Sequence, residues 1–166
     1  MSVTLLLAAC APHAGTTRAT LHDVDWYNRS YDVAGPGMTP QPRAFVGGGF
    51  DNHRGTDDDR EVFRIGSTWF VDVTRDGVDE AVVELIRDQS VFGTPSLVHL
   101  VVFSGDREQQ TVIGFLYVGD CRCSGVRRVG DVLEVAGGQT GVDGTACDGP
   151  GWSQQWRWDG ATMIER

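Results

Sequence analysis

From residue 61 onward, short apolar runs alternate with turn-forming residues. The runs cover residues 63–65, 68–73, 81–87, 97–104 and 111–118, and Gly, Pro, Asp or Ser separates them. Their lengths and their content of Val, Ile, Phe and Leu favour β-strands over helices. The pattern predicts a mainly β fold of about eight strands, either a single antiparallel curled sheet or a small sandwich, with one short helix near Trp26 as an option.

Two of these runs are apolar on both alternate faces. Residues 81–86 are interrupted only by Glu84, and residues 97–103 only by His99. Strands that bury both faces lie centrally in a sheet, so both runs are predicted to be central. His99 is expected to be a core or half-buried imidazole with satisfied hydrogen bonds, because the sequence places no nucleophile or carboxylate beside it.

A tight acidic turn lies between the runs 68–73 and 81–87. Its Asp76-Gly77 pair supplies the residue with positive φ that a reversal of extended chain needs. The spacing of Asp72, Thr74 and Asp76 also matches half of a calcium-binding loop. An EF-hand is excluded, because the twelfth position counted from Asp72 is Val83 and not a carboxylate.

A calcium site flanked by strands stays open as an alternative. Its oxygen ligands would be Asp72, Thr74, Asp76, Glu80 and the carbonyl of Val78. Thr74 removes one carboxylate from such a site and the neighbouring arginine adds a cation, and both changes weaken binding. The favoured hypothesis is therefore a structural turn without a cofactor.

Two more hairpins are predicted in the C-terminal half. Residues 126–129 and 132–135 flank the two-residue turn Gly130-Asp131. Trp152 and residues 154–158 precede Asp159-Gly160, and residues 162–164 follow it. Trp156 and Trp158 share one strand face by period two, and both are predicted to be buried.

The N-terminal part of the domain is rich in aromatic residues. Trp26, Tyr27 and Tyr31 are close enough in sequence to meet on one side of a turn, a helical coil or a strand. They are expected to be buried against the hydrophobic core, because aromatic side chains are more often buried than exposed.

Three cysteines lie in the domain. The hairpin around Gly130 returns to its starting end, so Cys123, which precedes it, and Cys147, which follows it, come to the same end. Cys147 is predicted to form a disulfide with Cys121 or with Cys123. A zinc site is disfavoured, because the pair Cys121-x-Cys123 has no second pair.

The first ten residues match the pattern of a bacterial lipoprotein signal. Apolar residues end in Leu7-Ala8-Ala9, immediately before Cys10. The apolar part is short and no Lys or Arg precedes it, so we expect residues 1–9 to be a signal segment truncated at its front. Cys10 is the predicted site of lipid attachment, residues 10–20 are the lipidated cysteine and its tether, and residues 21–166 are a single β domain.

The charge balance excludes one class of partner. The chain has 23 acidic and 14 basic residues, a formal net charge of −9, so nucleic acid is not an expected partner. The expected partners are the membrane, through the lipid anchor, and an envelope protein or ligand at the extracytoplasmic face of the cell membrane.

The lipobox, the segment Asp25-Trp26-x-Asn28-x-x-Tyr31 and residues 72–83 together resemble secreted actinobacterial lipoproteins of the LppP/LprE type. This resemblance implies an envelope lipoprotein with a compact β domain and no established activity. The expected function is therefore non-enzymatic binding or scaffolding at the cell envelope. The alternatives are a calcium-dependent adhesion module and, less favoured, a hydrolase that uses carboxylates. The candidate carboxylates are Asp72, Asp76, Asp79 and Glu84.

Overall fold

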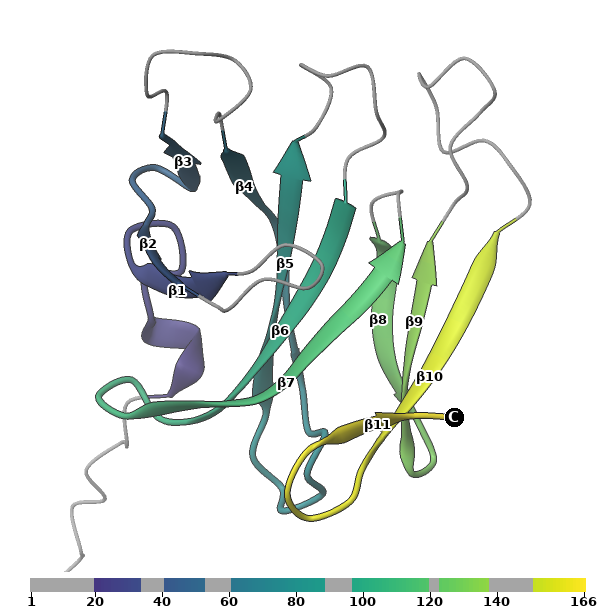
Figure 1. Ribbon diagram of the computed structural model, residues 1–166. Coiled ribbons are helices and arrows are strands. Elements are labelled where there is room, and N and C mark those ends of the chain that lie inside the picture. The colour runs from purple at the N-terminus through teal and green to yellow at the C-terminus, as the bar shows by residue number, and fades with distance from the viewer. Residues whose placement is uncertain (1–19, 34–40, 53–60, 89–96, 120–122, 138–150) are drawn as a thin grey trace, which may run out of the picture.

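The computed structural model describes residues 20–33, 41–52, 61–88, 97–119, 123–137 and 151–166 (Figure 1). These residues form a mainly β fold in which all strand pairs are antiparallel and the sheets are open, as the sequence predicts. The predicted short helix corresponds to a single 3-10 turn, η1 (Leu21–Asp23), which precedes Trp26.

A five-stranded sheet occupies the middle of the fold, in the order β3-β4-β5-β6-β7. Its strands are β3 (Gly49–Asp51), β4 (Val62–Val71), β5 (Glu80–Asp88), β6 (Leu97–Gly105) and β7 (Gln110–Gly119). The pairing of β5 and β6 with neighbours on both sides confirms that these two apolar runs are central.

Strand β4 joins two runs that the sequence shows as separate. The register between β4 and β5 shifts between Ile65 and Thr68, so the intervening Gly66 and Ser67 form a bulge. The buried carboxylate of Glu84 accepts a hydrogen bond from the Ser67 backbone N–H at 3.0 Å. A Cβ atom on Gly66 would lie 2.0 Å from Glu84 Oε2, so any other residue here would displace this buried carboxylate.

The C-terminal residues form a four-stranded sheet in the order β11-β10-β9-β8. Its strands are β8 (Cys123–Val129), β9 (Val132–Gly137), β10 (Trp152–Trp158) and β11 (Met163–Glu165). Both predicted hairpins are confirmed: Val129 pairs with Val132 around Gly130, and Trp158 pairs with Met163.

Two apolar cores lie on opposite faces of the five-stranded sheet. The first fills the space between the two large sheets, where Val82, Leu100 and Leu116 meet Leu133 and Trp156. Trp156 is buried as predicted, whereas Trp158 is only partly buried and packs against the edge of this core. Side chains alternate along a strand, so the other face of β5 and β6 contributes Ala81, Val83, Leu85, Val101 and Phe103 to the second core.

The N-terminal residues cover this second face (Figure 1). They comprise η1 and a two-stranded ribbon of β1 (Ser30–Val33) and β2 (Gln41–Ala44). Trp26 and Tyr31 are buried there as predicted, whereas Tyr27 is 47% exposed. The Trp26 indole N–H donates to the Leu21 carbonyl at 3.2 Å, and the Trp26 ring lies 5.0 Å from that of Phe103.

The 3-10 turn η1 also touches the end of β4 and the start of β5. The His22 ring stacks on Phe70 with 3.7 Å between centroids, and its Nε2 atom lies 3.6 Å from Asp79 Oδ2. The described chain therefore enters the fold beside the β4–β5 turn.

His99 is buried on β6, as predicted, between the rings of Phe115 and Tyr117. Its expected hydrogen bonds are not found, because neither ring nitrogen has a partner in the part of the chain that the structure describes. Burial lowers the pKa of His99, and the positive charge of Arg87 lowers it further. The imidazole is therefore held neutral.

Candidate functional site

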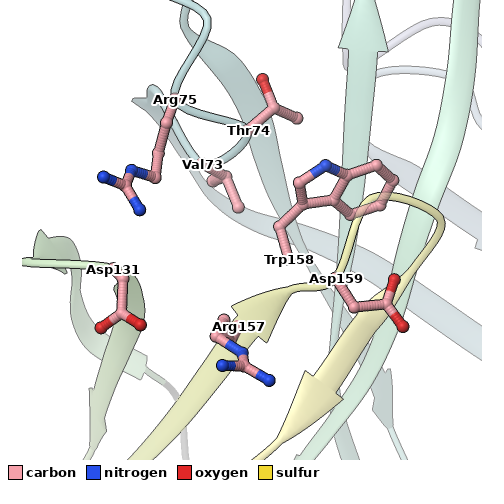
Figure 2. A pocket seen from close by; sticks show the side chains of 7 residues that line it. All are labelled: Val73, Thr74, Arg75, Asp131, Arg157, Trp158 and Asp159. Atoms are coloured by element: carbon pink, nitrogen blue, oxygen red, sulfur yellow. The ribbon is translucent and has the colours of Figure 1, made fainter.

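Three chain reversals meet at one end of the sandwich, the lower end in Figure 1. They are the β4–β5 turn, the β8–β9 turn and the β10–β11 turn. Between them lies an open cavity of about 450 Å³, lined by residues 73–75, Asp131 and residues 157–159 (Figure 2). We take this cavity and the turns around it as the candidate functional site.

Glu80 holds the β4–β5 turn from within. It is 1% exposed, and its Oε2 atom accepts hydrogen bonds from the backbone N–H groups of Val73 at 2.7 Å and Thr74 at 3.0 Å. Its Oε1 atom accepts from the hydroxyls of Thr74 at 3.1 Å and Ser104 at 3.3 Å. Burial raises the pKa of Glu80, and the hydrogen bonds from Thr74 and Val73 oppose this rise.

The two aspartates of the calcium hypothesis also make hydrogen bonds within the turn. Asp72 Oδ1 accepts from the Arg75 backbone N–H at 2.7 Å, and Asp76 Oδ1 accepts from the Val78 N–H at 2.8 Å. Asp72 Oδ2 forms an ion pair with Arg128 Nη1 at 2.9 Å, which connects the turn to β8 in the other large sheet. These contacts favour the structural interpretation of the turn.

The described residues contain no group of three or more Asp, Glu, His or Cys side chains that could hold a metal ion. Asp72, Asp76 and Glu80 are all described, and each serves a different part of the turn. The calcium alternative remains a prediction, and the calcium titration described below tests it.

The backbone of the turn adopts the predicted left-handed conformation at Gly77, where φ is 86°. Arg75 has a φ of 69°, and it is the only non-glycine residue with positive φ in the described ranges. Such a conformation costs on the order of 1 kcal/mol and persists only where neighbouring contacts impose it. Here the hydrogen bond from the Arg75 N–H to Asp72 imposes it, at the wall of the cavity.

We expect Gly77→Ala to lower the free energy of unfolding by about 1 kcal/mol, with or without calcium. A Cβ atom on Gly77 meets no atom within 4 Å, so the loss comes from the backbone conformation alone. Urea denaturation measures it. Gly125→Ala is the matched control, since Gly125 has equally open surroundings without a positive φ.

A calcium titration separates the structural turn from a calcium site. A melting temperature that rises by several degrees in low-millimolar calcium, and does not rise in Asp72→Asn, would contradict the structural hypothesis and establish the calcium alternative.

Two arginines line the cavity without ion-pair partners among the described residues, namely Arg75 and Arg157. The Arg157 Nε atom is buried and has no hydrogen-bond partner in the described part of the chain. The cavity also has two aspartates: Asp131 lies 3.9 Å from Arg166, and Asp159 accepts hydrogen bonds from the backbone at residues 161 and 162. These backbone hydrogen bonds lower the pKa of Asp159, and Arg157 lowers it further.

The other predicted site residues are distributed as follows. Cys10, Cys121 and Cys147 lie outside the described residues, and Cys123 begins β8, so the disulfide remains a prediction. The carboxylates considered for a hydrolase serve separate elements, since Glu84 binds the β4 bulge and Asp79 lies beside His22.

The sequence did not single out Asp131, Arg157 and Trp158 as neighbours of the β4–β5 turn. They come from hairpins far apart in the sequence, and only the packing of the two sheets brings them together. The local sequence signal extends only to the turns themselves, since Gly77, Gly130 and Gly160 each have a positive φ at one of the three reversals.

No family model matches the chain, and neither the curated proteins nor the solved structures contain a match to it. In the described ranges, no helix has the length and apolar character needed to cross a membrane. The fold and site thus define a β sandwich with an N-terminal covering layer and a polar cavity at one end.

Proposed function

We propose that this chain is a lipid-anchored protein of the cell envelope, whose β sandwich binds or scaffolds a partner at the extracytoplasmic face without catalysis. The observation that carries the proposal is Leu7-Ala8-Ala9-Cys10, followed by ten residues with little apolar bulk. Small residues before a cysteine suit the signal peptidase of lipoproteins, and the cysteine thiol accepts the lipid.

An anchor of this kind holds a domain firmly. Each buried methylene of an acyl chain contributes about 0.8 kcal/mol, so two or more chains on one cysteine keep the protein on the membrane. The resemblance of residues 25–31 and 72–83 to envelope lipoproteins supports the same function. The cavity supports a binding role, because its two arginines have no ion pair within the described ranges and concave sites with a few polar groups are the usual ligand sites.

The anchor is tested by metabolic labelling with an alkyne fatty acid, with the protein expressed from its own gene in its native host. We expect the native protein to be labelled and to fractionate with membranes, and Cys10→Ser to lose both properties. Cys121→Ser is the control, because a second cysteine should not affect acylation. Labelling that persists in Cys10→Ser would contradict the proposal.

A further inference from the structure

We propose that the end cavity binds a sugar acid, a pyranose ring that carries one carboxylate. This inference rests on the binding role proposed above and names its ligand class. Four features of the described residues carry it: two arginines without an ion pair among these residues, the balance of charge in the cavity, the presence of Trp158 in the lining and the polar character of that lining.

The arginines supply the carboxylate site. Arg75 and Arg157 come from different sheets and line one cavity, and the described residues offer neither guanidinium an ion pair. Figure 2 shows the Arg75 side chain reaching from the β4–β5 turn toward the side where Asp131 and Arg157 lie. A planar guanidinium binds a carboxylate through two parallel hydrogen bonds, so these groups suit an oxyanion.

The conformation of Arg75 adds to this argument. Its backbone is held in the left-handed region, which is unfavourable for a non-glycine side chain. Strained residues of this kind concentrate at ligand sites, where the strain fixes the direction of a side chain. The fold therefore maintains an unfavourable backbone conformation that places at the cavity a cation with no ion pair in the part of the chain that the structure describes.

The charge balance disfavours ligands with several negative charges. The lining contains two arginines and two aspartates, so its formal charge is zero. The chain as a whole carries −9, which repels polyanions. A carboxylate fits this environment better than a phosphate monoester with two negative charges.

The remaining lining suits a sugar ring rather than an acyl chain. Only Val73 and Trp158 are apolar among the lining residues, so a fatty acid would find little apolar surface. Trp158 lines the cavity and is half-buried, and an indole ring can contact the C–H groups of a pyranose. Asp131 and the Thr74 hydroxyl can accept hydrogen bonds from sugar hydroxyls. The volume of about 450 Å³ lies within the usual range of small-ligand sites.

The test uses the full chain with Cys10→Ser, which removes the lipid, and follows the indole N–H signal of Trp158 by ¹⁵N–¹H NMR. Trp158→Phe assigns that signal. Glucuronate is the probe, with glucose and glucose 6-phosphate as matched sugars that differ only in the group at carbon six. We expect a saturable shift with millimolar glucuronate and at least about tenfold weaker binding of both controls.

Variants then locate the binding. Arg75→Gln and Arg157→Gln should each weaken glucuronate binding about tenfold, because each removes a charge-assisted hydrogen bond. Arg127→Gln should leave it unchanged, since Arg127 is an exposed arginine that pairs with Glu134 on β9 and does not line the cavity. Melting curves verify that each variant is folded. Arg75 is exposed, so Arg75→Gln is expected to fold. It still tests the proposed binding if Arg157→Gln does not fold.

Several results would overturn the inference. These are the absence of a saturable shift, equal binding of glucose, tighter binding of glucose 6-phosphate, or equal losses in Arg127→Gln and Arg75→Gln. None of these results bears on the acylation of Cys10, which metabolic labelling tests separately. Failure of the ligand assignment is therefore distinguishable from failure of the lipoprotein assignment.

Discussion

Trp26→Ala is expected to lower the free energy of unfolding by about 3–5 kcal/mol, the range for truncating a buried aromatic side chain. Trp26 is 4% exposed and packs on Phe103, at the centre of the layer that covers the five-stranded sheet. Its indole N–H donates to the Leu21 carbonyl, and its own carbonyl accepts the Tyr31 hydroxyl at 2.5 Å. The substitution leaves a cavity and removes the first of these hydrogen bonds.

Urea denaturation of the full chain measures this loss. Val46→Ala is the matched control, because Val46 lies in the same N-terminal layer but is 80% exposed, and it should change stability by less than about 0.5 kcal/mol. A loss below about 1 kcal/mol in Trp26→Ala would show that the sheet does not depend on its N-terminal cover.

Glu80→Ala is expected to cost about 3 kcal/mol or more. The substitution leaves the buried N–H of Val73 and the N–H of Thr74 without their acceptor, and each unsatisfied group costs about 1–3 kcal/mol. Glu80→Gln keeps the shape and one carbonyl oxygen, so it should cost clearly less. Equal losses in the two variants would mean that the volume of the side chain matters and its hydrogen bonds do not.

The charge of Glu80 adds a pH dependence to this prediction. Burial raises its pKa in the folded protein, so the folded state binds a proton more tightly than the unfolded state does. The native protein should therefore gain stability relative to Glu80→Gln as the pH falls through the folded-state pKa. This gain is complete below the ordinary glutamate pKa. A relative loss on acidification would contradict the proposed burial.

The sheet could be predicted from local patterns, whereas its covering layer could not. Residues 81–86 and 97–103 are apolar on both faces, which is enough to place them centrally. The aromatic content of residues 26–31 indicates burial, but nothing in that segment says which surface it covers. Gly66 and Ser67 interrupt the apolar pattern of β4, so a bulge within one strand resembled a break between two.

The sequence predicted the turn at the candidate site but not the cavity, because the turn depends on local geometry and the cavity depends on long-range contacts. A carboxylate after an Asp-Gly turn is compatible with a metal ligand and with an internal acceptor, and only the burial of Glu80 distinguishes them. The Gly77 conformation depends on local geometry alone and was predicted correctly. The cavity depends on contacts between hairpins about 55 and 80 residues apart, which no local pattern encodes.

With the lipid anchor proposed above, the contact of His22 with Phe70 and Asp79 would limit how far the cavity can lie from a lipid surface. It fixes the start of the described chain beside the β4–β5 turn, whose other side lines the cavity. Thr20 follows Cys10 by ten residues, and an extended chain spans at most about 3.5 Å per residue, so an acylated Cys10 keeps this entry point within about 35 Å of the bilayer. The cavity would then work close to the membrane, on molecules that are themselves held at its surface or that diffuse into that thin layer.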